Sequence, residues 1–432
     1  PTISRPFKAL AALVAAEGRK NPDIAIKYAS IVRGWENTHK NLDSQLEGFE
    51  RIDAAAISRK REEDVLNWLR KQRGRTGDAP LQAHQALVAL HSQETTTRER
   101  DLVLGQLGRN GVLSAAITLY RAAIEREKPD LERELGYQQR DYANIEGGIA
   151  QMERIYHPTM DRELMRYWFA EYLRLPNEQR LQALDKWLGG RDDKAIARAL
   201  KSIAATKLGD TEERLRWLKA TRRDFERSKD PAIRYAVAMM PTLLQIEDAR
   251  KMRAGEMMMV RPTYLQAVSE FKKTKREAIY PDANGSLRIT FGNVTGYSTG
   301  NGVRHAPFTL LEEVASKATG TAPFDAPQAQ IDAIRAKRYG EYVDRKLGTV
   351  PVNFLSDLDI SGGNSGSPVL DAQGRLTGLA FDGNKESVSS NWVFDPAVTR
   401  MISVDQRYMR WIMDEVFPAP HLLEEMGVPP KK

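Results

Sequence analysis

The chain has 432 residues, and its 65 Lys and Arg against 58 Asp and Glu give a formal net charge of +7. This surplus is small and no long basic run concentrates it, so the composition does not indicate a dedicated nucleic-acid binder. Hydrophobic residues make up 41% and charged residues 28%, which is typical of a folded chain. Because there is no cysteine, disulfides, thiol catalysis and cysteine metal sites are excluded.

The first two thirds of the chain are predicted to be helical. Asn21–Asp23 combines a cap, a first-turn proline and a first-turn acid, which indicates a helix start. Apolar residues in 113–124 recur at i, i+4, i+7 and i+11, which is one face of a helix. Residues 181–188 show a similar face and are followed by two glycines, a helix stop.

The pattern changes near residues 279–285, where turn residues follow a charged helical stretch. Leu287–Gly292 alternates as a strand does. Further short β runs are predicted at 292–302, 350–355, 367–370, 376–381 and 392–394, with two helical stretches within 311–346 and a final amphipathic helix over 404–416. The predicted class is α+β: a large helical domain, residues 1–279, precedes a β-rich domain, residues 280–432.

The stretch Asp359–Val369 has the composition of a nucleophile turn. A reactive serine needs an exposed Oγ, a neighbouring base, and backbone N–H groups that face the developing oxyanion. Gly363 lets the backbone turn so that its N–H and that of Ser365 point into one hole. Gly366 keeps the space beside Ser365 open. The alternative is that Gly-Asn-Ser-Gly forms only a tight turn, since these residues favour turns.

The longer string Gly362–Val369, followed by a turn and a Gly-Leu-x-Phe strand, resembles the nucleophile loop of chymotrypsin-fold serine peptidases. The resemblance is to the bacterial form, in which an Asn precedes the serine. Trypsin-like zymogens have an Asp there, which pairs with a new N-terminus on activation. Because Asn364 stands at this position, we do not expect that ion pair to activate this chain.

A narrower resemblance covers almost the whole chain. Tyr280–Arg288, Gly292–Tyr297, Gly378–Asn384 and Val404–Ile412 are similar, in this order, to four motifs of the bacterial dipeptidyl-peptidase 7 and 11 family. In that family a helical domain is inserted into a chymotrypsin-like double β-barrel and caps the active-site cleft. The resemblance therefore implies that residues 1–279 form a helical cap. It also implies that residues 280–432 form the C-terminal part of the barrel, with the nucleophile and a closing helix.

The resemblance also implies roles for individual residues. Ser365 would be the acyl-enzyme nucleophile, and the N–H groups of Gly363 and Ser365 would bind the oxyanion. Asp382 would bind the free α-ammonium group of the substrate, so that a peptide with a blocked N-terminus leaves this carboxylate unpaired. Asn37, in a short matching string, would also hold the substrate N-terminus. The alternative for Asn37 is a plain polar surface residue. The alternative for Asp382 is an Asp that only forms a turn.

Gly383 bears on specificity. In the acidic-preferring branch of the family an Arg stands at this position and pairs with Asp or Glu of the substrate. Glycine is expected to leave an open, uncharged pocket. The sequence therefore predicts a preference for a hydrophobic or bulky residue in the second position of the substrate.

A serine peptidase also needs a general base, normally a His oriented by an Asp. None of the six histidines lies in a matching motif, and His305 is the only one in the β-rich part before Ser365. In the resembling family the catalytic His and Asp precede the helical domain. We therefore expect this chain to be the C-terminal piece of a longer enzyme, whose N-terminal part carries both, and we expect the isolated chain to be inactive.

Three functions remain open. The first is an exopeptidase that releases dipeptides from free N-termini; the others are an inactive protease-like module that binds peptide N-termini and an endopeptidase of the same fold. The resemblance implies a Gram-negative periplasm and a homodimer. The sequence has no metal-ligand spacing and no phosphate-binding loop, so no cofactor is predicted. It also has no nucleic-acid patch and no apolar run of membrane-spanning length.

Overall fold

The computed structural model describes residues 3–109, 111–277, 279, 285–300, 302–321, 323–390 and 392–428, with only the backbone of Thr76. The predicted domain start at 280–284 lies outside the described residues. The chain forms two compact units, Pro1–Lys40 with Arg61–Tyr280 and Asn41–Lys60 with Pro281–Lys432. These units differ from the predicted domains in residues 41–60, which pack with the C-terminal part of the chain.

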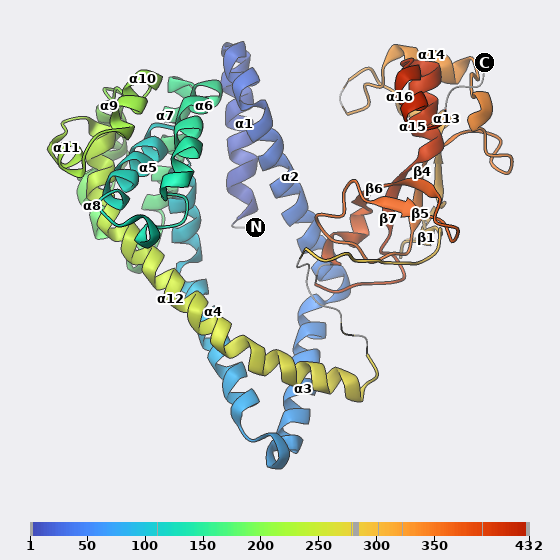
Figure 1. Ribbon diagram of the computed structural model, residues 1–432, viewed down its shortest axis with the longest axis horizontal. Coiled ribbons are helices and arrows are strands. Elements are labelled where there is room, and N and C mark those ends of the chain that lie inside the picture. Colours follow the sequence, from blue (N-terminus) through green and yellow to red (C-terminus); the bar gives the residue numbers. More distant parts are fainter. Residues whose placement is uncertain are drawn as a thin grey trace. The chain divides into compact units, whose positions relative to one another are not determined.

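The first unit is helical, and Figure 1 shows it from blue through green to yellow. Its elements, with α2 and α3 continuing into the second unit, are α1 (Ser4–Lys20), α2 (Pro22–Ile52), α3 (Ala54–Thr76), α4 (Ala79–Leu107), α5 (Gly111–Glu125), η1 (Asp130–Glu132), η2 (Gln139–Asp141), α6 (Tyr142–Ile155), α7 (Pro158–Leu173), η3 (Asn177–Gln179), α8 (Gln182–Leu188), α9 (Asp193–Ile203), α10 (Thr211–Leu218), α11 (Arg222–Arg227) and α12 (Pro231–Thr274).

The predicted helical faces are confirmed in this unit. Helix α2 begins at Pro22, as the cap pattern predicts. In α5, Leu113 and Tyr120 are buried in the core against α12. Helix α8 ends at Leu188 and is capped by Gly189, whose φ of 65° is the left-handed conformation that glycine adopts readily. Local periodicity and end signals are therefore sufficient to place these helices.

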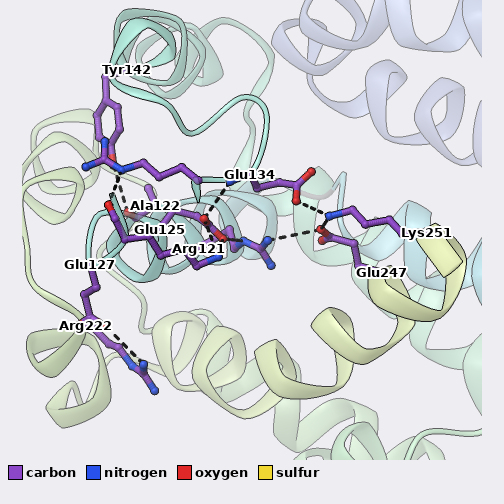
Figure 2. A network of polar contacts seen from close by, with 11 residues as sticks. Arg121, Ala122, Glu125, Glu127, Glu134, Tyr142, Arg222, Glu247 and Lys251 are labelled. Atoms are coloured by element: carbon purple, nitrogen blue, oxygen red, sulfur yellow. Dashed lines mark hydrogen bonds and ion pairs between the residues drawn. The ribbon is translucent and has the colours of Figure 1, made fainter. Parts of the chain in front are cut away.

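A buried carboxylate links the core helices of this unit (Figure 2). Glu125, at the end of α5, is fully buried and forms ion pairs with Arg121 at 2.8 Å and Lys128 at 2.9 Å. Burial alone would raise the pKa of Glu125, but the backbone N–H of Glu134, Lys128 and Arg121 together lower it. Arg121 also pairs with Glu247 of α12, so the carboxylate is satisfied and the network is structural.

The second unit contains the strands. Its elements besides residues 41–60 are β1 (Tyr297–Ser298), β2 (Arg304–His305), β3 (Phe308–Leu310), α13 (Leu311–Lys317), α14 (Gln328–Arg335), η4 (Gly340–Tyr342), β4 (Pro351–Ser356), β5 (Pro368–Leu370), β6 (Leu376–Gly383), η5 (Lys385–Ser389), β7 (Met401–Asp405), α15 (Gln406–Trp411), the π-helical turn η6 (Ile412–Val416) and α16 (Pro420–Glu425). Helices α13 to α16 gather at one end of its larger sheet (Figure 1).

The larger sheet is antiparallel, in the order β3-β4-β7-β6-β5. Val352 and Phe354 of β4 are buried, and Trp411 of α15 is fully buried in the core that covers one end of the sheet. Strands β1 and β2 pair separately. Among the described residues the sheet is open, with β3 and β5 at its edges. The α and β content is as predicted, but the double β-barrel is not confirmed.

Three local predictions are wrong. Leu287–Gly292 is not a strand, and Leu287, Ile289 and Phe291 are 90%, 81% and 90% exposed. Alternation marks a segment that suits a sheet, but a strand forms only where a partner strand is present. Residues 392–394 form no strand either. The helix predicted to start at Val404 is α15, which begins at Gln406, because residues 401–405 form β7, the central strand of the sheet.

Candidate active site

The turn from Ser361 to Ser367 has the form that an exposed nucleophile needs. The side-chain oxygen of Asn364 accepts a hydrogen bond from the N–H of Ser361 at 3.0 Å, and its backbone oxygen accepts from Ser367 at 3.0 Å. Gly363 and Gly366 have φ angles of 101° and 85°, which residues with a Cβ rarely adopt. The half-buried Asn364 thus closes a tight loop around Ser365, and the two glycines permit its sharp turns.

Ser365 lies exposed at the tip of this loop. Its hydroxyl donates to the backbone oxygen of Phe381 in β6 at 3.1 Å. Two backbone hydrogen bonds tie the loop to the same strand: Gly366 donates to Ala380 at 2.7 Å, and Ala380 donates to Ser367 at 3.0 Å. Strand β6 therefore fixes the position of the serine.

The amide N–H groups of Gly363 and Ser365 donate no hydrogen bond within the described part of the chain. Backbone donors in a folded protein usually find a partner, so exposed donors on a fixed loop can bind a ligand or water. An oxyanion that develops next to the Ser365 Oγ is such a ligand. The structure is thus compatible with the predicted pair of donors, whose role stays a prediction.

A β-bulge precedes Asp382. The pairing of β6 with β7 shifts between Ala380 and Asp382, so Phe381 has no partner residue. Bulges re-aim side chains and occur often beside active sites. Asp382 is exposed, and its carboxylate accepts the N–H of Gly383 at 2.8 Å. Ser365 therefore bonds to the residue directly before Asp382, which brings the predicted nucleophile and the predicted amine-binding residue to one end of β6.

Gly383 differs from the expectation of an open pocket. A Cβ built on Gly383 would lie 2.2 Å from the hydroxyl oxygen of Ser387, far closer than atoms approach without bonding. Ser387 is buried and donates to the backbone oxygen of Asn384 at 2.7 Å. The direction in which a side chain would leave residue 383 is therefore filled by Ser387 of η5.

Sequence reasoning gave no role to several polar residues that follow or contact the Asp382–Gly383 segment. Asn384 is buried and donates to Glu386 at 2.9 Å, and Glu386 also accepts the hydroxyl of Tyr297 at 2.9 Å. Burial and the bond to Glu386 raise the pKa of Tyr297. The buried Arg400 donates twice to the backbone oxygen of Gly296, at 3.0 and 3.1 Å. Asn384 follows the Asp-Gly pair and could have been noticed, but no local pattern marks Arg400.

In the described residues, the hydroxyl of Ser365 bonds to a backbone oxygen, and no hydrogen bond links it to a histidine. His305 lies in β2 and stacks on the ring of Tyr297, with ring centres 4.4 Å apart. His157 contacts Asn21, and His84 contacts Glu62. The origin of the general base stays a prediction.

Asn37 lies on α2 in the first unit and is exposed. Its role in binding the substrate stays a prediction. Within the described residues, no group of three or more His, Cys, Asp or Glu is placed to hold a metal ion. No helix in that part of the chain has both the length and the apolar character to span a membrane.

Comparison with known proteins identifies relatives over nearly the whole chain. The Asp/Glu-specific dipeptidyl-peptidase of Shewanella putrefaciens is 35% identical over 451 residues, covering 99% of this chain and 61% of that protein. Dipeptidyl-peptidase 7 of Porphyromonas endodontalis is 28% identical over 428 residues, covering 93% and 48%. The chain therefore spans less than two thirds of the length of these relatives.

The fold has solved counterparts as well. The crystal structure of Porphyromonas endodontalis DPP11 in complex with the dipeptide Arg-Glu matches with a TM-score of 0.77 and 23% identity, covering 99% of this chain and 60% of that one. The family model Peptidase S46 matches residues 1–428. The resemblance indicated by the four sequence motifs is thereby confirmed, and the chain belongs to the Peptidase S46 family.

Proposed function

We propose that this chain carries the nucleophile and the amine-binding residue of a serine-type dipeptidyl-peptidase. Ser365 attacks the second peptide carbonyl of a substrate, and the N–H groups of Gly363 and Ser365 stabilise the tetrahedral oxyanion. The peptide beyond the cleaved bond leaves with a proton on its new amine, and water then hydrolyses the acyl-enzyme to release the dipeptide. The observation that carries this proposal is the bond from Ser365 to Phe381, next to Asp382. The names of the relatives support the reaction class.

Asp382 binds the free α-ammonium group of the substrate. Its carboxylate is exposed and, among the described residues, bonds only to the adjacent N–H of Gly383, so it can accept further donors. Asp382 directly follows Phe381, whose backbone oxygen accepts the Ser365 hydroxyl. An ammonium group bound at Asp382 therefore lies a short distance from the bond that Ser365 attacks. That geometry selects dipeptide release.

The proposed specificity is for a hydrophobic or bulky second residue. This part rests on the absence of a charged side chain at Gly383. The relatives include both Asp/Glu-specific enzymes and dipeptidyl-peptidase 7, so their names do not decide it. Ser387 fills the direction in which a side chain would leave residue 383, so the proposal rests on the missing charge and not on an open pocket there.

The general base comes from residues outside this 432-residue chain. Ser365 bonds to a backbone oxygen and not to a histidine, and a serine hydroxyl needs a base to become a nucleophile. We propose that a His and an Asp of a partner segment supply it, in the first barrel of a chymotrypsin-like double barrel. The exposed alternating residues Leu287, Ile289 and Phe291 suit contact with such a segment. A periplasmic homodimer is part of the same proposal.

A direct test uses a fluorophosphonate probe, which reacts only with an activated serine. The native enzyme should be labelled at Ser365, and the isolated 432-residue chain should not. Labelling of the isolated chain, or its hydrolysis of a dipeptidyl substrate, would contradict the proposed external base. Absence of labelling in the native enzyme would contradict serine catalysis.

The second candidate is a module that binds peptide N-termini without cleaving them. The same bond from Ser365 to Phe381 favours it, because it leaves the hydroxyl proton held by a backbone oxygen rather than by a base. Calorimetry with a free and an N-acetylated tripeptide separates the two functions. A module binds the free peptide and leaves it intact, whereas the peptidase turns it over.

A further inference from the structure

The segment that follows the Asp382–Gly383 corner is held firmly on its sheet side. The buried side chain of Asn384 donates to the backbone oxygen of Val398 at 2.7 Å and accepts from the N–H of Arg400 at 2.9 Å. The backbone N–H of Asn384 donates to the backbone oxygen of Arg400 at 2.9 Å as well. These three bonds fix where η5 begins.

On its other side η5 is covered by the last turns of α2, which pack within the same unit. Gly48 is buried there, and a Cβ built on it would lie 2.9 Å from the hydroxyl oxygen and 3.0 Å from the Cβ of Ser389. Ser389 is itself buried. A glycine inside a helix destabilises the helix relative to alanine. The close packing against Ser389 explains why glycine stands at position 48, because a larger residue would collide there.

Residues on both sides of Gly48, within Glu47–Arg51, also hold η5; we call this set of contacts the clamp. Lys385 of η5 forms an ion pair with Glu47 at 2.8 Å, and the Arg51 guanidinium donates to the backbone oxygen of Glu386 at 3.1 Å. The ring of Phe49 meets that of Trp392 edge to face, with centres 6.1 Å apart. The ion pair is exposed and solvent screens it, so packing around Gly48 dominates the clamp.

We infer that the last turns of α2, Glu47–Arg51, position the Asp382–Gly383 corner by clamping η5, with Gly48 as the key positioning residue. The inference rests on the proposed function of Asp382. Displacement of η5 reaches the corner directly, because Ser387 of η5 lies against Gly383. Asp382 is one residue further and bonds to the N–H of the same Gly383. A helix far from this corner in sequence thus sets how well the substrate amine is held.

The test compares Gly48→Leu with a matched control, Gly74→Leu, in the native full-length enzyme. Gly74 also lies inside a helix, α3, but a Cβ there meets nothing within 4 Å. Gly48→Leu should raise KM for a dipeptidyl substrate by about threefold or more while kcat stays within about twofold, the pattern of weakened substrate binding. Hydrogen exchange of residues 382–390 should also become faster. The control should change neither.

A rescue experiment separates positioning from general damage. Gly48→Ala brings a Cβ against Ser389, and Ser389→Gly removes both atoms that it meets. The double variant should return KM and the exchange of 382–390 toward wild type, and this milder pair also serves if Gly48→Leu does not fold. The inference would be overturned if hydrogen exchange of residues 382–390 stayed unchanged in a folded Gly48→Leu variant. It would also be overturned if adding Ser389→Gly to Gly48→Ala failed to return KM and exchange toward wild type. If wild type cleaves no dipeptidyl substrate, the proposed function fails, and the exchange data still decide the clamp.

Discussion

The hydroxyl of Ser365 donates to the backbone oxygen of Phe381, the residue immediately before Asp382. Phe381 sits in a β-bulge and has no pairing residue in β7, so its backbone oxygen faces the serine loop. One short segment of β6 therefore carries the hydrogen-bond partner of the proposed nucleophile and the carboxylate that we propose binds the substrate amine. In the proposed reaction, this arrangement couples the position of the cleaved bond to the position of the substrate N-terminus.

Replacing Ser365 with alanine should abolish activity without harming the fold. The side chain is exposed and makes one hydrogen bond, so its loss changes the free energy of unfolding by less than about 1 kcal/mol. Activity should fall by at least about a thousandfold, since no acyl-enzyme forms. Steady-state rates and thermal unfolding of the native enzyme check this. Ser390→Ala, which removes another hydroxyl of the same unit, should retain activity.

Asp382→Asn should raise KM for free N-termini by about tenfold or more, because the ammonium group loses its countercharge. The variant should also discriminate less between free and N-acetylated substrates. Asp325→Asn is a suitable control, since Asp325 is an exposed carboxylate in the same unit. Equal KM values for wild type and Asp382→Asn would remove this residue from the site.

Gly383→Arg should shift preference toward Asp and Glu only when Ser387 is also changed. The Cβ of the new side chain would meet the Ser387 hydroxyl, so the single variant displaces η5 before its guanidinium can reach a substrate. Adding Ser387→Gly clears that space. The measurement is the ratio of kcat/KM on Asp- and Leu-containing dipeptidyl substrates. A ratio that stays unchanged in the double variant contradicts the role of residue 383 in specificity.

Asp161 should make the helical unit more stable as the pH falls from about 6 to 4. Burial raises the pKa of Asp161 to about 6, although its carboxylate accepts the N–H of Gly111 at 2.7 Å and of Val112 at 3.4 Å. Because the folded pKa lies above the unfolded value, the folded state binds the proton more tightly. Relative to Asp161→Asn, wild type should therefore gain up to about 3 kcal/mol on acidification across this window. Denaturant unfolding at pH 4, 5, 6 and 7 checks it, and a parallel pH profile for both proteins would refute it.

Features that depend on neighbouring residues could be predicted from the sequence alone. The start of α2 at Pro22, the buried face of α5 and the turn around Ser365 all follow from short patterns. The helical prediction for Val404 is wrong because its segment also fits a helical face, and only pairing with β4 and β6 makes it a strand. Such pairings join distant residues, so periodicity cannot reveal them.

The parts of the site that depend on distant residues could not be predicted. Arg51 bonds to Glu386 across 335 positions of sequence, and nothing near either residue indicates the other. The same holds for Ser387, which fills the space beside Gly383. Leu287–Gly292 shows the reverse case, because its alternation is clear but the described residues give it no partner strand. A local pattern indicates which structures a segment can form, and packing decides which one it adopts.

Product analysis of one oligopeptide, offered to the native enzyme with a free and with an acetylated N-terminus, distinguishes dipeptide release at Ser365 from the alternative functions. We expect mass spectrometry to find dipeptides released stepwise from the free peptide, the acetylated peptide to stay intact, and Ser365→Ala to stop the release. Cleavage of both peptides at internal bonds, or release that persists in Ser365→Ala, would contradict the proposed function.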